Sequence, residues 1–319
     1  MRLIRLAVVF FAALLSAGAL AQYPARPIRM LVPNPPGGAT DTLARVIAPK
    51  LAEALGQPVV VENRPGSNGN LSSELTARAA LDGYTLLLAP DSQIVINPHL
   101  YARMPLDTLK DLAPVATLVS TQMVLAVIPS LPAKTFQEFV EYARRANPPL
   151  AYASIGNGSQ HHLAMEMLKA RAGIDLVHVP YKGGGPATVA ILGSEVSAMF
   201  GGNSVAGHIR AGKLRALALA GRKRTASYPD VPTLGEFYPG LEVTTWLALF
   251  APQGVPLPVL AKLRAEINRL LGETDLRDRL RKVGGLEPFV TTAEEFTAMI
   301  RSDYAKYERV VKAAGARVD

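Results

Sequence analysis

The chain of 319 residues contains no cysteine. This absence excludes a disulfide framework, a thiol nucleophile and cysteine ligands for a metal. It also excludes the cysteine to which a lipid anchor is attached in exported bacterial proteins. An exported form of this chain would therefore need an outer membrane to retain it, which favours the periplasm of a Gram-negative bacterium.

Long apolar runs are also scarce. Beyond the leader, no segment reaches about 18 apolar residues without a charge, as a membrane-spanning helix requires. The leader has an apolar stretch, Leu6–Leu15, that follows Arg2 and Arg5 and precedes the small residues Ala19-Leu20-Ala21. This order is typical of a cleavable signal peptide. We therefore expect residues 1–21 to be a signal peptide that is cleaved after Ala21, and the mature protein to be periplasmic.

Aromatic residues are few, at 6%, and charges of one sign are not clustered. The formal charge of +8 falls to +6 without the leader, because two arginines are lost and 32 basic against 26 acidic residues remain. A nucleic-acid partner would require basic residues gathered with aromatics, so none is expected. A modest positive field can help to attract small anions.

Histidines number five, and His161 and His162 are adjacent. On a helix, neighbouring side chains point about 100° apart, so these two cannot form the i, i+4 pair of a metal site. We expect neither a metal nor a cofactor.

Apolar runs alternate with helical patterns along most of the chain, which predicts an α/β fold with covered, parallel or mixed sheets. The expected strands are 28–33, 58–62, 84–89, 122–129, 176–179, 196–200, 214–220 and 246–250. The expected helices are 41–55, 70–80, 135–146, 160–171, 186–193 and 204–211. From Pro256 onward the pattern is mostly helical, and Thr292 with Glu295 predicts a capping box for the last helix.

Two loops in the first quarter of the chain are expected to bind an anion. Each follows a Val- and Ile-rich run and leads into a helix, so that free backbone N–H groups are presented. The first contains Pro36, Gly37, Gly38, Ala39 and Thr40, and the second contains Ser67 and Asn68. Asp41 is interpreted as a helix cap, since a carboxylate would repel an anionic solute.

Loops in the middle of the chain repeat this chemistry. Ligands of open α/β sheets gather at the carboxyl ends of strands, so these loops are expected to form the other wall of a cleft. The candidate ligand contacts there are Asn157, Ser159, His161, Tyr181 and Asn203. Ser159 can equally be only a helix cap.

Short motifs spread over the whole mature chain carry a family resemblance. They are Pro36-Gly37-Gly38 with Asp41, Val61-Glu62-Asn63-Arg64, Asp82-Gly83-Tyr84-Thr85-Leu86, Val179-Pro180-Tyr181-Lys182-Gly183 and Pro229-Asp230-Val231-Pro232-Thr233. The chain resembles the Bug-type (TctC-like) periplasmic solute receptors of tripartite tricarboxylate transporters. It departs from them at Gly66-Ser67-Asn68-Gly69, where a Gly-Ala-Gly-like loop is expected.

The resemblance implies a type II periplasmic-binding-protein fold, with two lobes and an interlobe cleft. Lobe one would comprise 22–123 plus 247–319, and lobe two 124–246. It also implies capture of a small carboxylate or dicarboxylate by hinge closure, for delivery to the membrane subunits of a tripartite transporter. We expect a monomer.

Two other functions stay open. The first is an exported hydrolase that uses Ser159 or Ser204 with a histidine, and the second is a solute receptor that acts in signalling. Gly207–Leu214 nearly matches a phosphate-binding loop, but Leu214 stands where a hydroxyl residue would hold magnesium. Gly202–Ala206 resembles a nucleophile elbow, yet it ends in alanine and lacks ordered partners. No catalytic residue is therefore expected, and the protein is expected not to be an enzyme.

Overall fold

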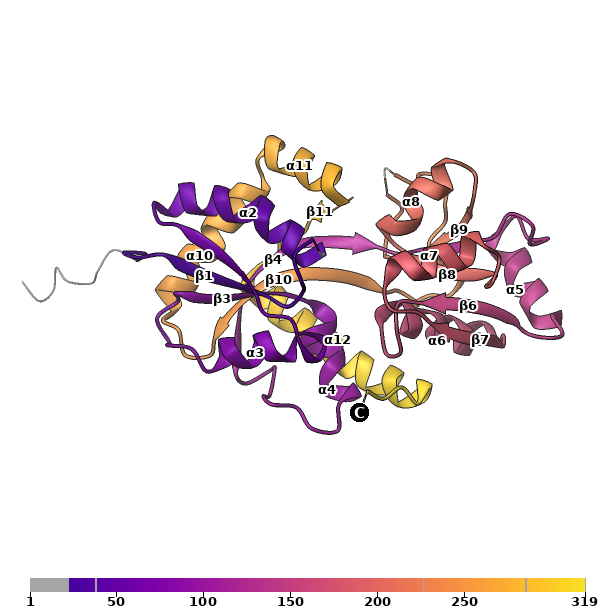
Figure 1. Ribbon diagram of the computed structural model, residues 1–319, viewed down its shortest axis with the longest axis horizontal. Coiled ribbons are helices and arrows are strands. Elements are labelled where there is room, and N and C mark those ends of the chain that lie inside the picture. The colour runs from indigo at the N-terminus through magenta and orange to yellow at the C-terminus, as the bar shows by residue number, and fades with distance from the viewer. Residues whose placement is uncertain (1–22, 38, 226, 285, 319) are drawn as a thin grey trace, which may run out of the picture.

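The computed structural model describes residues 23–37, 39–225, 227–284 and 286–318. The predicted signal peptide and its cleavage site lie outside these ranges, as does Gly38. The described chain forms two lobes, each built on one sheet (Figure 1). Within the described ranges, no helix combines the length and apolar character needed to cross a bilayer.

The first lobe is built on a six-stranded mixed sheet in the order β11-β4-β10-β3-β1-β2. Strands β3, β1 and β2 are parallel, and β10 and β4 are antiparallel to their neighbours. The bounds are β1 Ile28–Val32, β2 Val59–Asn63, β3 Thr85–Pro90, β4 Leu112–Gln122, β10 Thr244–Pro252 and β11 Glu287–Pro288.

The helices of the first lobe cover both faces of this sheet (Figure 1). Side chains along a strand alternate between two cores: Met30 and Val32 pack with α2, α10 and α11, whereas Leu31 packs with α4 and α12. The bounds are α2 Ala39–Leu55, α3 Asn70–Ala77, α4 Asn97–Leu100, α10 Leu257–Leu271, α11 Thr274–Gly284 and α12 Ala293–Ala314, with a 3-10 turn η1 at Ser67–Gly69 and a π-helix η2 at Ser92–Ile96.

The second lobe is built on a five-stranded sheet in the order β7-β6-β8-β5-β9, in which β7, β6 and β8 are parallel. Helices α5 and α6 pack in one core of this lobe, and α7 and α8 pack in the other. The bounds are β5 Val124–Val127, β6 Leu150–Ser154, β7 Leu176–Pro180, β8 Ala198–Gly201, β9 Arg215–Leu219, α5 Phe136–Arg145, α6 Gln160–Ala172, α7 Gly184–Leu192, α8 Asn203–Arg210 and α9 Leu234–Phe237.

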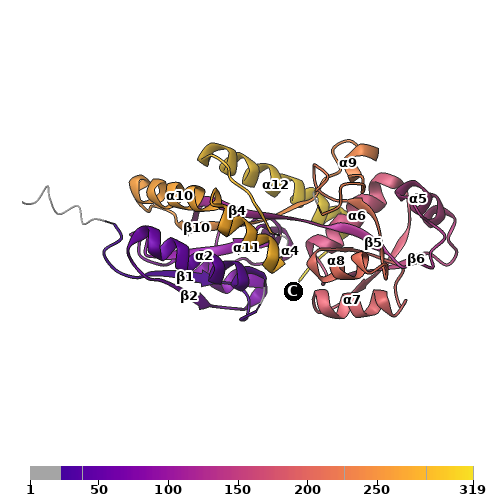
Figure 2. The ribbon, with the colours of Figure 1, turned by 90° about the horizontal axis from the view of Figure 1, so that it is seen from above.

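Two paired segments connect the lobes. The chain leaves the first sheet at the end of β4 and enters β5 directly after Met123, and it returns along β10, whose Thr244 pairs with Gln122. The lobes also touch through their helices, because α12 of the first lobe packs against α6 of the second (Figure 2). Leu163 of α6 is fully buried among side chains of the first lobe that include Leu100.

The strands and helices expected from the sequence are confirmed, each within three residues of its observed ends. Most of β4 was not predicted, because Pro114 interrupts its pattern. Pro114 is accommodated since β11 pairs only with Val119 and Ser120, which leaves that side of β4 without a neighbouring strand at Pro114. The segment η2–α4 was also missed, and it contributes to the site.

Candidate functional site: a cavity between the lobes

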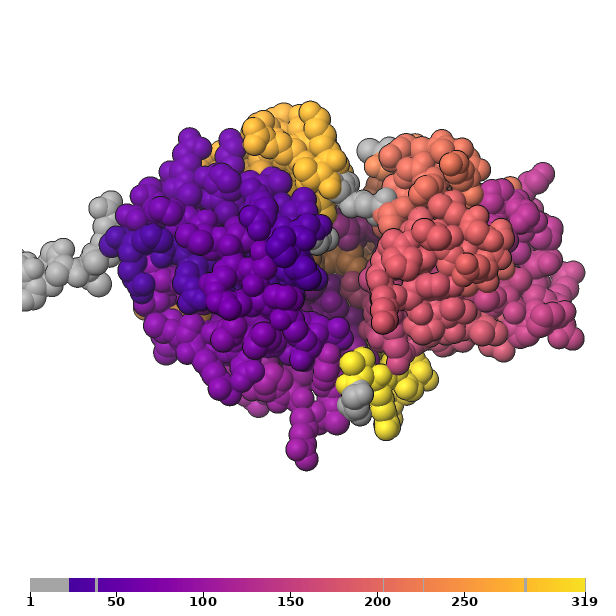
Figure 3. Space-filling model, viewed as in Figure 1, coloured from indigo at the N-terminus to yellow at the C-terminus, as the bar shows by residue number. Residues whose placement is uncertain are grey.

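A cavity of about 480 Å³ lies between the two lobes. One wall consists of the loops that follow β1, β2 and β3, and the other is the loop that follows β6. These are carboxyl ends of parallel strands, as expected. The molecule is visibly hollowed between the lobes (Figure 3). The lining is Pro33, Asn34, Pro35, Pro65, Gly66, Ser67, Asn68, Gly69, Pro90, Ser92, Asn97, Leu100, Ile155, Gly156, Asn157, Gly158 and Ser159.

The first loop is held by Asp41 at the start of α2. The Asp41 carboxylate accepts hydrogen bonds from the Gly37 amide at 2.8 Å, from Arg45 Nε at 2.9 Å and from Asn63 Nδ2 at 2.8 Å. The hydrogen bond from Arg45 is the main reason that the pKa of Asp41 falls to about 2. Asp41 is 2% exposed and has these partners, so it anchors the loop.

The cavity is lined by Pro33, Asn34 and Pro35, which precede the predicted loop, whereas Pro36, Gly37 and Thr40 are not among its lining residues. The Gly37 N–H is bound to Asp41, and the Thr40 hydroxyl donates to Asn34 Oδ1 at 2.6 Å. Pro36 is exposed and Ala39 begins α2, whereas Asn34, which the sequence analysis did not select, lines the cavity.

Two residues of the second loop, Ser67 and Asn68, line the cavity. Both have left-handed backbones, with φ of 48° and 52°. Such conformations cost about 1–3 kcal/mol for residues other than glycine and persist where neighbours enforce them.

Two buried amides of the η2–α4 segment hold the second loop in this shape. Asn97 Nδ2 donates to the Asn68 carbonyl at 3.0 Å, and Gln93 Nε2 donates to the Gly69 carbonyl at 2.7 Å. The sequence analysis did not select these amides, because the i→i+5 hydrogen bonding of the π-helix η2 changes the directions of the side chains in and after it.

The second lobe contributes Asn157 and Ser159 to the cavity. Ser159 is the N-cap of α6, and its Oγ accepts from the His162 amide at 3.3 Å. An accepting hydroxyl keeps its own hydrogen, so Ser159 can cap the helix and donate into the cavity. The amide of Asn157 donates to the Arg317 carbonyl at 3.0 Å, which ties this loop to the C-terminal segment.

Two other predicted contacts of the second lobe, His161 and Tyr181, lie outside this lining. Burial lowers the pKa of His161 to about 4, so its ring is neutral, and its Nδ1 is buried without a hydrogen-bond partner. Tyr181 donates its hydroxyl to Glu195 at 3.3 Å. Asn203 begins α8, and its side chain is not among those described.

Two residues that adjoin the lining in the chain, Asp91 and Gln160, make a contact that the sequence did not reveal. Gln160 Nε2 of α6 donates to Asp91 Oδ2, directly after β3. Asp91 also accepts from the Ser92 amide at 2.8 Å. Burial first, and then the nearby Asp303, raises the pKa of Asp91 to about 8.

The described lining offers uncharged donors. None of the lining residues that the structure describes is Asp, Glu, Lys, Arg or His. Nowhere in the described part of the chain do three or more His, Asp or Glu side chains gather as a metal site would require. The arrangement is suited to an anion that is held by amide and hydroxyl hydrogens.

A hydrolytic site would need an accessible serine beside a base. Ser159 Oγ is bonded to the backbone of His162 and not to its ring. A serine–imidazole pair does exist, Ser154 Oγ with His178 Nε2 at 2.7 Å, but Ser154 is fully buried. A nucleophile in that position cannot reach a substrate.

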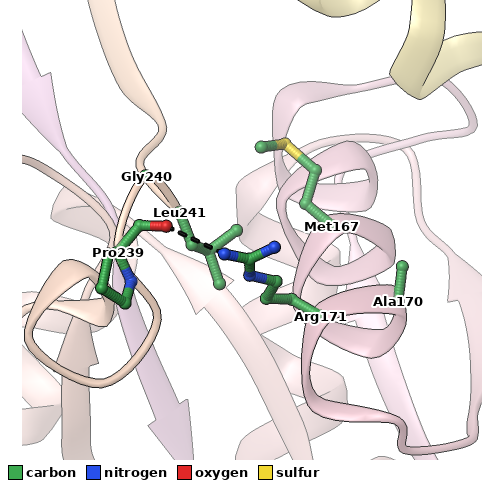
Figure 4. A pocket seen from close by; sticks show the side chains of 6 residues that line it. All are labelled: Met167, Ala170, Arg171, Pro239, Gly240 and Leu241. Atoms are coloured by element: carbon green, nitrogen blue, oxygen red, sulfur yellow. Dashed lines mark hydrogen bonds between the residues drawn. The ribbon is translucent and has the colours of Figure 1, made fainter.

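Another hollow, of about 410 Å³, lies on the second lobe at α6 and the loop around Gly240 (Figure 4). Its charged group, Arg171, donates to the Pro239 carbonyl at 3.1 Å. All of its lining residues belong to the second lobe, so a ligand bound there would not contact both lobes and would not stabilise their closure.

Comparison with known proteins agrees with this geometry. Residues 43–316 match the family described as "Tripartite tricarboxylate transporter family receptor". Protein BugT of Bordetella pertussis is 37% identical over 93% of this chain and 91% of its own length.

Two solved structures are similar over nearly their full length. An R. palustris protein with adipate is 30% identical, with a TM-score of 0.78 over 92% of this chain and 99% of that one. MatC from Rhodopseudomonas palustris with bound malate is 32% identical, with a TM-score of 0.74 over 91% of this chain and 100% of that one. These similarities confirm the predicted periplasmic-binding-protein fold.

Proposed function

The chain belongs to the tripartite tricarboxylate transporter receptor family, and from this membership and the cavity between its lobes we propose that it binds a small carboxylate or dicarboxylate. The family consists of periplasmic receptors and not of enzymes, so the sequence-based prediction of a solute-binding protein is confirmed.

The proposal that the ligand is a carboxylate rests on one observation. The cavity has donors on both walls, Ser67 and Asn68 from the first lobe and Asn157 and Ser159 from the second, and its described lining is uncharged. Donors fixed by the fold stabilise an anion without a buried cation. The volume of about 480 Å³ is in the range of small-molecule sites. Adipate and malate, seen with two structural relatives, are carboxylates of this size class.

The mechanism is closure of the two lobes around the solute. A ligand that contacts both walls stabilises the closed arrangement over the open one by its differential affinity. The lobes are assigned as 22–123 plus 247–319 and 124–246; β10 of the first sheet begins at Thr244, three residues before the second of these boundaries.

The cellular role follows from the same proposal. The leader is removed after Ala21, and the mature chain acts as a monomer in the periplasm. The closed, loaded form delivers its solute to the membrane subunits of a tripartite transporter.

A thermal-shift screen tests the proposed ligand class. Mono-, di- and tricarboxylates, beginning with malate and adipate, are compared with neutral sugars and amines in the presence of a chelator. A carboxylate at ~100 times its dissociation constant should add about 2.7 kcal/mol of stability. A series in which sugars or amines raise the melting temperature and carboxylates do not would contradict the proposal.

A further inference from the structure

In the second lobe, three aromatic rings form a stacked column next to the Gly156–Ser159 loop, which follows β6. The His162 and His178 rings are 3.8 Å apart and nearly parallel, at 6°. Tyr152 also stacks on His178, with the ring centroids 5.0 Å apart and the planes inclined by 21°. The rings come from α6, β7 and β6, which lie together in the second lobe (Figure 1). None of the three lines the cavity.

The column is bonded to the loop at two glycines. The Gly158 amide donates to His162 Nδ1 at 3.0 Å, and the Gly156 amide donates to Ser154 Oγ at 3.2 Å. The same Ser154 Oγ is 2.7 Å from His178 Nε2 and 3.0 Å from the Gly156 carbonyl. Between them, these bonds fix the backbone on both sides of Asn157.

The directions of these bonds define the protonation of the rings. A backbone N–H can only donate, so His162 Nδ1 must be without a proton and the ring must be neutral. If the Ser154 hydroxyl donates to the Gly156 carbonyl, its oxygen accepts from both the Gly156 amide and His178 Nε2. Every polar atom of the serine then has a partner.

We propose that His178 and His162 are positioning residues for the ligand: they hold the Gly156–Ser159 loop in the shape that presents Asn157 and Ser159 to the cavity. This inference rests on the proposed function, because it concerns the same cavity. Neither ring touches the solute, and both act through the loop.

The loop needs such support because its backbone is unusual. Gly156 has φ of 138° and Gly158 has φ of 71°, in the region where residues with a side chain are strained. Packing alone would be served as well by phenylalanine rings. The imidazole rings add two hydrogen bonds that phenylalanine cannot make. His162 Nδ1 accepts from the loop at Gly158, and His178 Nε2 bonds to Ser154 beneath the loop.

The charged groups around the column do not compete for these nitrogens. The groups that face His178 are Ser154 and Tyr152 of β6, and His162, Glu166 and Lys169 of α6. Glu166 accepts from the Tyr152 hydroxyl at 2.7 Å and from Lys169 at 2.9 Å, so its charge is already compensated. Burial lowers the pKa of both histidines, to about 4 for His178, and a neutral ring is what the bond from Gly158 to His162 requires.

Paired substitutions separate the nitrogens from the rings. His178→Phe and His162→Phe keep a flat ring and remove the nitrogens. His178→Gln keeps a donor near Nε2, and His162→Asn keeps an acceptor near Nδ1. Adipate and malate binding is measured by calorimetric titration for each variant, and hydrogen exchange of the 155–159 segment is measured without ligand.

We expect the phenylalanine variants to bind about tenfold more weakly and to exchange faster at residues 155–159. The glutamine and asparagine variants should stay within about threefold of the unaltered protein. Val140→Ala, in the core of the second lobe on α5, is the control. It should lower the unfolding midpoint without changing affinity.

Two results would contradict the proposal, and a third has a different meaning. Phenylalanine variants with unchanged affinity and unchanged exchange would show that the nitrogens do not position the loop. Equal losses in the conservative variants would show that only ring packing matters. If the unaltered protein binds no carboxylate, the proposed function fails, and hydrogen exchange alone then decides whether the column holds the loop.

Discussion

The side-chain amide of Gln160 donates to the carboxyl group of Asp91, and this bond joins α6 of the second lobe to the end of β3 in the first. Asp91 is 1% exposed, and Gln160 adjoins the capping residue Ser159. Ser92 and Ser159, the chain neighbours of these two residues, line the cavity from opposite lobes, so the bond helps to set the distance between the two walls of donors.

Removing this donor should loosen the contact between the lobes. Gln160→Ala leaves a buried carboxyl group with one partner fewer, which costs about 1–3 kcal/mol of folding free energy. Urea unfolding measures that loss, and solution scattering should show a larger radius of gyration without ligand. Gln137→Ala, an exposed glutamine on α5, is the control. Equal behaviour of the two variants would mean that the bond does not hold the lobes together.

Stability should be greatest near pH 6.5. The pKa of Asp91 rises from 3.8 to about 8 on folding, so the folded state holds an extra proton and loses stability as pH rises through this window. The pKa values of His161 and His178 fall from 6.5 to about 4, so stability increases with pH between those values.

Below pH 6.5 the two histidines outweigh the aspartate, and above it Asp91 acts alone. Unfolding midpoints between pH 4 and pH 9 at constant ionic strength should therefore pass through a maximum. A midpoint that keeps rising from pH 6.5 to pH 8 would contradict the assignment of a proton to Asp91. The variant Asp91→Asn should abolish the decline on the alkaline side.

Ser159 should act in both binding and stability. Ser159→Ala removes a hydroxyl that can donate to a carboxylate, which should weaken binding by about 1–3 kcal/mol. It also removes the cap of α6, at a cost of about 1 kcal/mol in unfolding free energy. Thr135→Ala removes only a cap, that of α5. If Ser159→Ala resembles Thr135→Ala in stability and leaves affinity intact, Ser159 is a cap alone.

A side chain at Gly158 should lower both stability and ligand affinity. A Cβ at this position would lie 2.6 Å from a methyl group of Leu100 in the opposite lobe, with φ of 71°. Gly173→Ala, at the other end of α6, has a similar φ of 62° and no neighbour within 4 Å. Both changes should cost about 1–2 kcal/mol of stability through backbone strain.

The contact with Leu100 adds a second effect at Gly158. Gly158→Ala should also weaken ligand binding, because the two lobes can no longer approach to the same distance. Leu100→Ala in the same chain should restore part of the affinity. Identical affinities for the Gly158→Ala and Gly173→Ala variants would show that this contact has no part in closure.

The sequence predicted the parts of the site that depend on neighbouring residues. Apolar runs that stop at glycine and proline located the loops at Ser67 and Ser159, because chain direction and capping are local properties. Asp91, Gln93 and Asn97 were not selected, since their partners are set by a π-helix and by packing between distant segments.

The ring column was not predictable for a similar reason. His162 and His178 are separated by most of α6 and a short loop, and they meet because β7 lies beside β6, with Tyr152 opposite His178 in the register. The sequence analysis considered His162 only as a metal ligand and excluded it. Spacing along the chain contains no information on a stack that forms across two elements.

A single calorimetric titration tests the central claim most directly. The mature protein, with a chelator present, is titrated at pH 7 with a dicarboxylate such as adipate or malate and, in parallel, with the corresponding uncharged diamide. The account predicts saturable binding of one carboxylate per chain and no detectable heat from the diamide, since the donors of both walls are satisfied by anionic oxygens. Equal binding of the diamide, or binding of neutral sugars where every carboxylate fails, would contradict it.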